Sequence, residues 1–328
     1  NGQFDPGEGE TPWTCLVAPS GSVSWWEAEN SASDSWGLNH CVMLDGATYV
    51  AGKKGQGFHL DGVNDRILCE NTTGLNFGPG ADFTLEAWIK PETSVNSYGV
   101  ATVISKRYSP NTSVTLGYEM YLADGKLGLR LDDPTNKRAF QLTTPDLRDG
   151  NFHHVAITVD RDNSNGVKFY VDGSLASTTF NATEVPGDLS NSEPLRIGNH
   201  PTAYLNCFFK GVIDEPAIYN RALSAAEVQS LYQAGAAGKC PIAPAIVTQP
   251  SAQTVNAGNR ATFQVIAQGS LLTYQWYKGT APVGVNSPSL VIESSQLTDA
   301  GSYHVEVNNG NGLPSVTGWP ASRRRLIS

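Results

Sequence analysis

Short segments in which apolar and polar residues alternate, separated by Gly, Asn and Asp, constrain the fold of this chain most. In the segment FTLEAWIK, every second side chain from Phe83 to Ile89 is apolar, and Glu86 lies among the residues between them. Successive side chains of a β-strand point to opposite faces, so this pattern predicts a strand with one buried face. HHVAITVD and VKFYVDG predict further strands. Many strands joined by such turns favour an all-β sandwich of two antiparallel sheets.

Two local signals refine this prediction. In GYEMYLADGKLGLRL the pair Asp124 and Gly125 predicts a hairpin, because both residues tolerate the positive φ of a tight turn. One short helix is predicted after the last strand, where Ser224 and Glu227 form a capping box and Gly235 provides the stop. We expect this one-sided helix to pack on the outside of the sandwich.

Length and charge exclude several classes of protein. The 328 residues suggest two domains, and 40% hydrophobic with 16% charged residues allows a packed core. The net charge of -9 argues against binding to a nucleic-acid backbone, which requires a basic face. No apolar run reaches the roughly 20 residues of a membrane helix. Phosphate-binding glycine motifs are also missing from the sequence.

Several segments between about residues 15 and 240 occur in the order typical of one family. They are VSWWEAENSASD, GATYVAGKKGQGFHLDGVNDRI, FTLEAWIKP, DLRDGNFHHVAITVD, VKFYVDG, PLRIGN and FKGVIDEPAIYNRALSAAEVQSLYQAG. In these segments the chain resembles the laminin-G-like, concanavalin A-like jelly rolls of bacterial secreted proteins. The resemblance implies a jelly-roll sandwich that ends in one helix.

A second, smaller domain resembles an immunoglobulin fold. The segment from Asp299 to Tyr303 is similar to the start of the immunoglobulin F strand, and Trp276 stands where the core tryptophan of strand C belongs. Val265 and Val305 replace the two cysteines of the family, and we expect them to fill that space by burial. The predicted organisation is an extension over 1–14, a jelly roll over 15–240, a Pro-rich linker over 241–253, an overlapping immunoglobulin-like domain over 244–318 and a basic tail over 319–328.

Five cysteines without a CxxC pair favour disulfides over a zinc site, and disulfides indicate an exported protein. Cys15 and Cys240 bracket the jelly roll, so a bond between them would tie its ends together. Cys69 and Cys207 are the second expected pair because both flank strands near one edge, which leaves Cys41 as a thiol. The predicted location is therefore secreted, extracellular or on the cell surface.

The resemblance also implies a structural calcium near the joined terminal strands. Glu29, Asp34 and Asp214 match the acidic positions of the family that are associated with it. Calcium takes six to eight oxygen ligands, which carboxylates and carbonyls on adjacent strands can provide. The alternative is that Asp214 accepts hydrogen bonds from turn amides while Glu29 and Asp34 are solvated.

No catalytic residue is predicted. A glycosidase needs two carboxyl groups roughly 5 to 10 Å apart. Asp214 and Glu215 are adjacent and would point to opposite faces of a strand. His153 and His154 are expected to pack rather than react. A glycoside hydrolase or polysaccharide lyase on this fold remains the alternative function.

Ligand contacts are expected at the rim of the sandwich, in the loops SKRYSPNTS and GNHPTAYLN. Flat side chains match the CH face of a sugar ring, and amides match its hydroxyl groups. The candidate ligand-binding residues are Arg107, Tyr108, Asn199, His200, Tyr204 and, as a separate stacking residue, Trp36.

The sequence thus predicts a non-catalytic carbohydrate-binding or adhesive part of a larger extracellular protein. The expected partner is a polysaccharide or other glycan, with no nucleic acid and no membrane insertion. A structural alternative makes both domains spacers without a ligand.

Overall fold

The computed structural model describes residues 15–70, 72–93, 99–108, 115–200, 207–270, 272–309 and 316–318. The predicted N-terminal extension and basic tail lie outside these residues. The chain divides after Cys240 into two compact units, and residues 35–38 group with the second unit. Among the described residues, no helix has the length and apolar character needed to cross a membrane.

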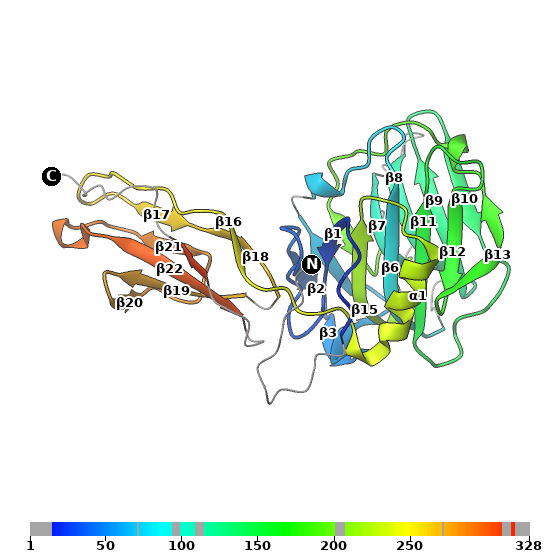
Figure 1. Cartoon of the computed structure of the whole chain (residues 1–328), viewed down its shortest axis with the longest axis horizontal. Helices are drawn as coiled ribbons and strands as arrows, with labels where there is room; N and C mark the ends of the chain where they lie inside the picture. The colour runs from blue at the N-terminus through cyan, green and yellow to red at the C-terminus, as the bar shows by residue number, and fades with distance from the viewer. Residues whose placement is uncertain are drawn as a thin grey trace. The chain divides into compact units, whose positions relative to one another are not determined.

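Two antiparallel sheets form the first unit (Figure 1). The strands of the eight-stranded sheet are β1 (Ser22–Trp25), β3 (Thr48–Ala51), β4 (Gln56–Asp61), β6 (Phe83–Pro91), β11 (His153–Val159), β12 (Val167–Val171), β13 (Ser174–Phe180) and β15 (Lys210–Tyr219). Their order is β13-β12-β11-β6-β15-β4-β3, and β1 pairs with β15.

The strands of the seven-stranded sheet are β2 (Cys41–Leu44), β5 (Arg66–Cys69), β7 (Val100–Tyr108), β8 (Leu116–Ala123), β9 (Lys126–Asp132), β10 (Lys137–Gln141) and β14 (Leu195–Ile197). Their order is β10-β9-β8-β7-β14-β5-β2. Neighbours in this order that are distant in sequence, such as β7 and β14, show that the chain crosses repeatedly between the sheets. The predicted two-sheet jelly roll is therefore confirmed.

The core lies between the two sheets and follows the alternation of the sequence. Leu85 and Ile89 of β6 belong to the same buried cluster as Met120 of β8 and Leu129 of β9. The pair Asp124 and Gly125 joins β8 to β9 with φ values of 48° and 75°, as a tight hairpin requires. Local sequence thus places the strands and their faces correctly in this hairpin.

The expectation that β6 has one buried face is wrong. Glu86 and Trp88, on the face away from the core, are only 1% and 4% exposed. A helix, α1 (Ala225–Ala234), lies across this outer face in Figure 1, and the ring of Tyr232 is 5.7 Å from that of Trp88. The predicted capping box of α1 is present. Four short 3-10 helices complete the helical elements of the described residues: η1 (Thr73–Leu75), η2 (Ala182–Glu184), η3 (Gly235–Ala237) and η4 (Leu297–Asp299).

A buried polar cluster lies beneath this cover, and we call Glu86, His154, Glu215, Tyr219 and Lys239 the closure cluster. The Lys239 Nζ is 2.9 Å from Glu86 Oε1 and 3.5 Å from Glu215 Oε2. His154 Nε2 lies 3.2 Å from Glu86 Oε2, and the Tyr219 hydroxyl donates to Glu86 Oε1 at 3.2 Å. The carboxylate of Glu86, in the middle strand β6, therefore holds the C-terminal segment of the unit through Lys239.

The two ends of this unit meet beside the closure cluster. The Cys240 amide donates to the Leu16 carbonyl at 2.8 Å, and the Leu16 amide donates to the Gly238 carbonyl at 2.9 Å. The predicted disulfide between Cys15 and Cys240 is confirmed.

The second predicted disulfide is wrong, because Cys69 bonds to Cys41 and not to Cys207. Cys41 in β2 stands directly opposite Cys69 in β5, with Cα atoms 4.0 Å apart. Cys207 remains a buried thiol beside β7, where its carbonyl accepts from the Thr102 amide at 3.1 Å.

The second unit consists of short antiparallel strands. They are β16 (Ala245–Thr248), β17 (Ala261–Gln264), β18 (Ile266–Gln268), β19 (Leu272–Lys278), β20 (Ala281–Val283), β21 (Ser289–Ile292), β22 (Tyr303–Asn309) and β23 (Val316–Gly318). One sheet has the order β20-β19-β22-β23, and β16 pairs with β18 and β17 with β21. Trp276 lies in the core with Val265 and Val305, which confirms that buried valines stand in the place of the disulfide.

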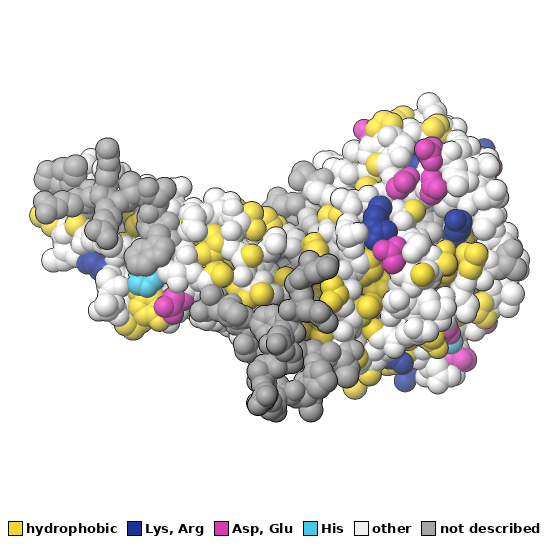
Figure 2. All heavy atoms as spheres, viewed as in Figure 1, with side chains coloured by type: hydrophobic (Ala, Val, Ile, Leu, Met, Phe, Trp, Pro, Cys, Tyr) yellow, Lys and Arg dark blue, Asp and Glu magenta, His cyan; other side chains and the backbone are white. Residues whose placement is uncertain are grey.

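Charged side chains are dispersed over the surface. On the face shown in Figure 2, Lys and Arg side chains of the described residues lie in small separate groups, with acidic side chains nearby. The described residues on this face form no broad basic patch.

Candidate functional site

The outer face of the seven-stranded sheet carries polar side chains in register across β8, β9 and β10. Tyr118, Met120 and Leu122 of β8 point into the core, so Glu119 and Tyr121 between them point outward. Directly opposed residues of an antiparallel pair share a face, so the partners of Glu119 and Tyr121 on the neighbouring strands point outward as well.

Strand pairing sets these outward residues side by side. Glu119 of β8 stands opposite Arg130 of β9, and Tyr121 stands opposite Gly128. Gly128 in turn stands opposite Gln141 of β10. Residues from three strands therefore form two adjacent polar rows on one surface.

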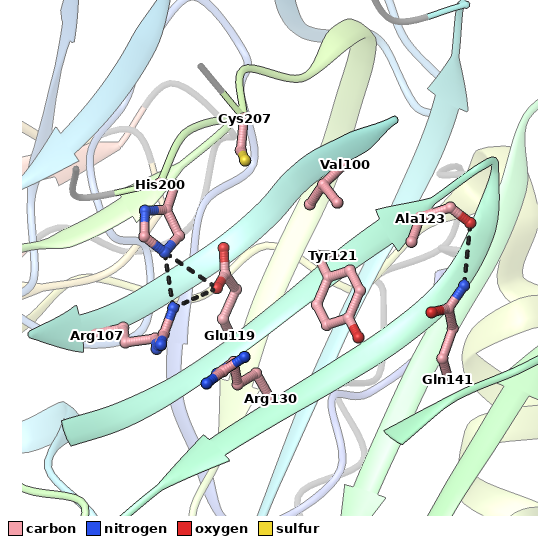
Figure 3. Close-up of a pocket in the computed structure, with 9 residues that line it drawn as sticks. All are labelled: Val100, Arg107, Glu119, Tyr121, Ala123, Arg130, Gln141, His200 and Cys207. Atoms are coloured by element: carbon pink, nitrogen blue, oxygen red, sulfur yellow. Dashed lines mark hydrogen bonds and ion pairs between the residues drawn. The ribbon is translucent and has the colours of Figure 1, made fainter. Parts of the chain in front are cut away.

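A cavity of about 260 Å³ opens over these rows (Figure 3). Its walls come from β7 to β10 and from the segments that follow β14 and precede β15. The lining residues are Val100, Arg107, Glu119, Tyr121, Ala123, Arg130, Gln141, His200 and Cys207.

Arg107 organises the charged end of the cavity. Its Nε donates to Asp132 Oδ2 at 2.7 Å, and its Nη1 lies 3.5 Å from Glu119 Oε2. Glu119 also accepts from the Thr102 hydroxyl at 2.6 Å. We call Arg107, Glu119, Asp132 and His200 the cavity cluster. All four are nearly buried, so their mutual contacts hold them in place before any ligand arrives.

His200 is a neutral acceptor in this cluster. Its Nε2 lies 2.8 Å from Arg107 Nη1, and because a guanidinium can only donate, Nε2 accepts. Burial lowers the pKa of His200, and Arg107 lowers it further, although the Glu119 carboxylate acts in the opposite direction. Burial likewise raises the pKa of Cys207 to about 12, which keeps that wall of the cavity an unreactive thiol.

Tyr121 forms the flat part of the floor. A Cβ atom on Gly128 would lie 2.5 Å from Cζ of the tyrosine, so only glycine leaves room for the ring to lie across β9. Burial raises the pKa of Tyr121 to about 12, and its hydroxyl therefore stays protonated at neutral pH. Tyr121 is 8% exposed, and the part that lines the cavity belongs to a side chain with an apolar face and a hydrogen-bonding tip.

Arg130 and Gln141 supply further polar groups, each anchored by one protein partner. Arg130 Nε is held by Asp132 Oδ1 at 3.2 Å, while its terminal nitrogen atoms have no protein acceptor among the described residues. Gln141 donates through Nε2 to the Ala123 carbonyl at 3.2 Å, which directs the amide without using its Oε1 as an acceptor. The cavity therefore offers a fixed donor and a fixed acceptor beside an aromatic face.

The structure brings together two of the predicted ligand-binding residues, Arg107 and His200. Asn199 is 6% exposed and donates to the His200 carbonyl at 3.1 Å, so it supports that loop. The side chain of Tyr108 and all of Tyr204 lie outside the described residues. Trp36 is half-buried and falls in the segment grouped with the second unit. A ligand-binding role for these residues remains a prediction.

Sequence reasoning missed Glu119, Tyr121, Arg130 and Gln141. A signal for the first three was present, because a two-residue turn at Asp124 fixes the pairing of the flanking strands. Counting outward from that turn places Tyr121 opposite position 128 and Glu119 opposite Arg130, as observed.

Backbone amides already engage the three residues predicted to bind calcium. Asp34 accepts from the amides of Trp25 at 3.0 Å and Asn39 at 3.1 Å. Glu29 Oε2 accepts from the Gln56 amide at 3.2 Å.

Asp214 Oδ2 accepts from the amides of Lys53 and Lys54, at 2.7 and 2.9 Å. Its Oδ1 is buried without a hydrogen-bond partner among the described residues, and burial with the neighbouring Glu215 raises its pKa to about 8. Within the described residues, no three His, Cys, Asp or Glu side chains converge on one point. Calcium binding by Glu29, Asp34 and Asp214 remains a prediction.

Comparisons with known proteins agree with the two-unit architecture. The model of the concanavalin A-like lectin/glucanases superfamily matches residues 61–229, and that of the immunoglobulin domain matches residues 243–309. Adhesion G-protein coupled receptor V1 of Danio rerio is 23% identical over 156 residues, which are 46% of this chain and 2% of the receptor. The chain thus corresponds to a small part of that curated relative.

Solved structures of toxin binding domains share the fold. The binding domain of Paraclostridial Mosquitocidal Protein 1 has 17% identity and a TM-score of 0.51, over 90% of this chain and 73% of that chain. A structure of botulinum neurotoxin type C, whose cell entry is described as dependent upon interaction with two ganglioside molecules, has 10% identity and a TM-score of 0.51, over 90% and 72% of the two chains. At these identities the likeness concerns the fold alone.

Both disulfides and both domain types are typical of extracellular proteins. Because the superfamily model covers more than half of its residues, the chain belongs to the concanavalin A-like lectin/glucanases superfamily, with an immunoglobulin domain following.

Proposed function

We propose that this chain is a non-catalytic carbohydrate-binding module within a larger extracellular adhesive protein, and that the cavity of the seven-stranded sheet holds the sugar. The observation that carries the proposal is the Tyr121 ring lying across Gly128, with hydrogen-bonding side chains on either side of it. An aromatic face covers the CH side of a pyranose, and flanking amide and guanidinium groups bond its hydroxyls.

The order already present in the cavity supports binding. Arg107 and Glu119 hold each other through contacts that need no ligand, so little side-chain entropy is lost when a sugar enters. The cavity of about 260 Å³ is slightly below the roughly 300 to 1,000 Å³ of pockets for drug-sized ligands. It therefore suits one sugar residue at the end or branch of a chain.

The relatives point in the same direction. The solved structures include binding domains of toxins, and the cell entry of one toxin is described as dependent upon gangliosides, which are glycolipids. The curated relative is an adhesion receptor of far greater length. These descriptions belong to those proteins, and they support a recognition role here as part of the proposal.

The test is binding to a glycan array and to insoluble polysaccharides, with the wild-type chain compared with Tyr121→Ala. We expect the wild type to be retained on at least one glycan and the variant to lose most of that retention. The matched control is Tyr49→Ala, which removes a partly buried tyrosine of β3, on the other sheet. Retention of neither protein on any glycan would contradict the proposal and favour the spacer alternative.

The enzyme alternative is tested on the same panel with a reducing-end assay and, for lyase chemistry, absorbance of unsaturated products. Glu119 is the carboxylate among the described residues that line the cavity. The nearby Asp132 is fully buried between two arginines and is not accessible to a substrate. An inverting or retaining hydrolase needs two accessible carboxyl groups. We therefore expect no product, and product formation that Glu119→Gln abolishes would overturn the non-catalytic assignment.

We further propose, independently of the cavity, that the family calcium binds near Asp214. The buried Oδ1 of that residue supports this step, since a cation would supply the contact that the described protein atoms do not. A ligand bound only to the native state raises the melting temperature. We expect EDTA to lower the midpoint of thermal unfolding and added calcium to restore it. An unchanged midpoint would contradict the calcium proposal.

A further inference from the structure

We infer that the cavity selects a sugar residue bearing a carboxylate, with the Arg130 guanidinium as the carboxylate contact. This inference deepens the proposed function and rests on it. The ligand is an acidic pyranose, and it has two possible sources. It occurs as a uronate within polysaccharides and as a sialate at the ends of glycan chains.

The charges of the cavity do not all face the ligand. The Asp132 carboxylate is 0% exposed and contacts both arginines, while Glu119 is held by Arg107 and by the Thr102 hydroxyl. The two negative charges are therefore compensated inside the protein. Arg107 and Arg130 together balance them, and Arg130 is the more exposed of the two cations, with 34% of its side chain exposed against 7%.

The two arginines differ in what they can still bind. The Arg107 side chain is 7% exposed and its nitrogen atoms are used by Asp132, Glu119 and His200. The Arg130 side chain is 34% exposed, and its contacts within the described residues involve Nε alone. Its terminal nitrogen atoms form a planar pair of donors, the geometry that matches a carboxylate through two parallel hydrogen bonds.

Asp132 also directs Arg130. By holding Nε at 3.2 Å it fixes the plane of the guanidinium, so the terminal nitrogen atoms need little further ordering on binding. Figure 3 shows Arg130 and Tyr121 on neighbouring strands at the same side of the cavity. A phosphate or sulfate group can engage the same pair of donors, so a comparison of carboxylated with sulfated glycans is part of the test.

The spacing of the two polar rows suits one acidic sugar. Arg130 and Gly128 are two residues apart on β9, which is about 7 Å along the strand. A pyranose stacked on the Tyr121 ring over Gly128 would therefore direct a ring carboxylate toward Arg130. Gln141, in the same row as Tyr121, would then accept a hydrogen bond from a sugar hydroxyl through Oε1.

The experiment measures the affinity of the chain for polygalacturonate, for the same polymer after reduction of its carboxyl groups, and for a sialylated oligosaccharide with its desialylated form. We expect each acidic ligand of the preferred source to bind about ten- to a hundredfold more tightly than its neutral counterpart, as expected when a charge-assisted contact is lost. Preference for polygalacturonate identifies a uronate, and preference for the sialylated oligosaccharide identifies a sialate.

Three variants distinguish a specific contact with Arg130 from a general effect of positive charge. Arg130→Gln should abolish the preference for the acidic ligand, and Arg130→Lys should retain part of it because the charge remains without the planar pair. Arg138→Gln is the matched control, because it removes an arginine from the neighbouring strand β10 that does not line the cavity. Near-ultraviolet circular dichroism confirms that each variant is folded.

The outcomes are distinguishable from those for the proposed function. Equal affinity for acidic and neutral forms, or a preference that survives Arg130→Gln, would overturn the inference while the sugar-binding function stands. A preference for sulfated over carboxylated glycans would also overturn it. Failure of every glycan to bind would overturn both.

Discussion

The outer faces of the two sheets each carry a cluster of charged side chains, and the clusters differ in what covers them. Over the closure cluster lie α1 and the paired chain segments around Leu16 and Lys239, so Glu86 and Lys239 are 1% and 3% exposed. Over the cavity cluster lies an open cavity, and Arg130 at its margin is partly exposed.

Both sheets therefore contain the same arrangement on their outer faces, a buried carboxylate paired with a cation. The pair fastens the closing segments in one sheet and, in the proposed function, holds the ligand-binding side chains in place in the other. An outward polar residue in an alternating pattern does not reveal which role it has, because the covering segment decides it. Substitutions in the two clusters, and in the disulfide beside one of them, can test this contrast.

Removing the disulfide that holds the cover in place, with Cys15→Ser and Cys240→Ser together, should cost about 4 to 5 kcal/mol of unfolding free energy. The bond closes a loop with a sequence separation of 225, and the unfolded chain gains entropy when it is cut. Urea unfolding measures the loss. The matched control is the double serine variant of Cys41 and Cys69, whose separation is 28 and whose loss should be smaller. A larger loss in the control would contradict the role of the cover.

Glu86→Gln should lower the free energy of unfolding by about 3 to 5 kcal/mol, because it leaves the Lys239 ammonium buried without its nearer carboxylate. Chemical denaturation at neutral pH measures this. Sugar binding below the unfolding transition should persist, since the cavity lies on the other sheet.

At acidic pH, Glu86→Gln and the wild type should have nearly the same free energy of unfolding. Burial raises the pKa of Glu86, but Lys239 and His154 outweigh it and hold the pKa at about 2, below its ordinary value of 4.5. Its stabilising contribution is therefore present above about pH 4.5 and is lost as the pH falls toward 2. A difference that stays constant over this range would show that the charge of Glu86 is not what fastens the cover.

Glu119→Gln should cost less, about 1 to 3 kcal/mol, because Arg107 keeps Asp132 as a partner. The pKa of His200 should fall further, since the Glu119 carboxylate is the group that raises it. Nuclear magnetic resonance titration of the imidazole measures this shift. An increase in the His200 pKa would be incompatible with the described cluster.

Arg130→Gln should change the unfolding free energy by only about 0.5 kcal/mol, because its side chain is partly exposed and Asp132 keeps Arg107. Thermal unfolding beside the wild type measures this. A loss as large as that of Glu86→Gln would abolish the distinction between a fastening cluster and a recognising one.

Much of the fold could be predicted because its signals are local. The signals for strand β6, the Asp124 turn and the Ser224 cap each lie within a few residues, and all three elements are present in the structure. The burial of both faces of β6 could not be predicted, because Lys239 reaches Glu86 across a sequence distance of 153 residues.

The candidate site was predictable only in part, for a related reason. Arg107 and His200 were chosen as rim residues and do line the cavity. Tyr121 and Arg130 were recognisable only through strand register, which hairpin geometry supplies but composition does not. The pairing of Cys41 with Cys69 was not predicted for a similar reason, because β2 and β5 become neighbours only through the fold of the chain.

The bond between Cys15 and Cys240 has a mechanical consequence. Its two Cα atoms are 4.9 Å apart, while 225 positions of sequence lie between them. Tension applied along the polypeptide from either side passes through the sulfur bridge and leaves the sandwich unstretched.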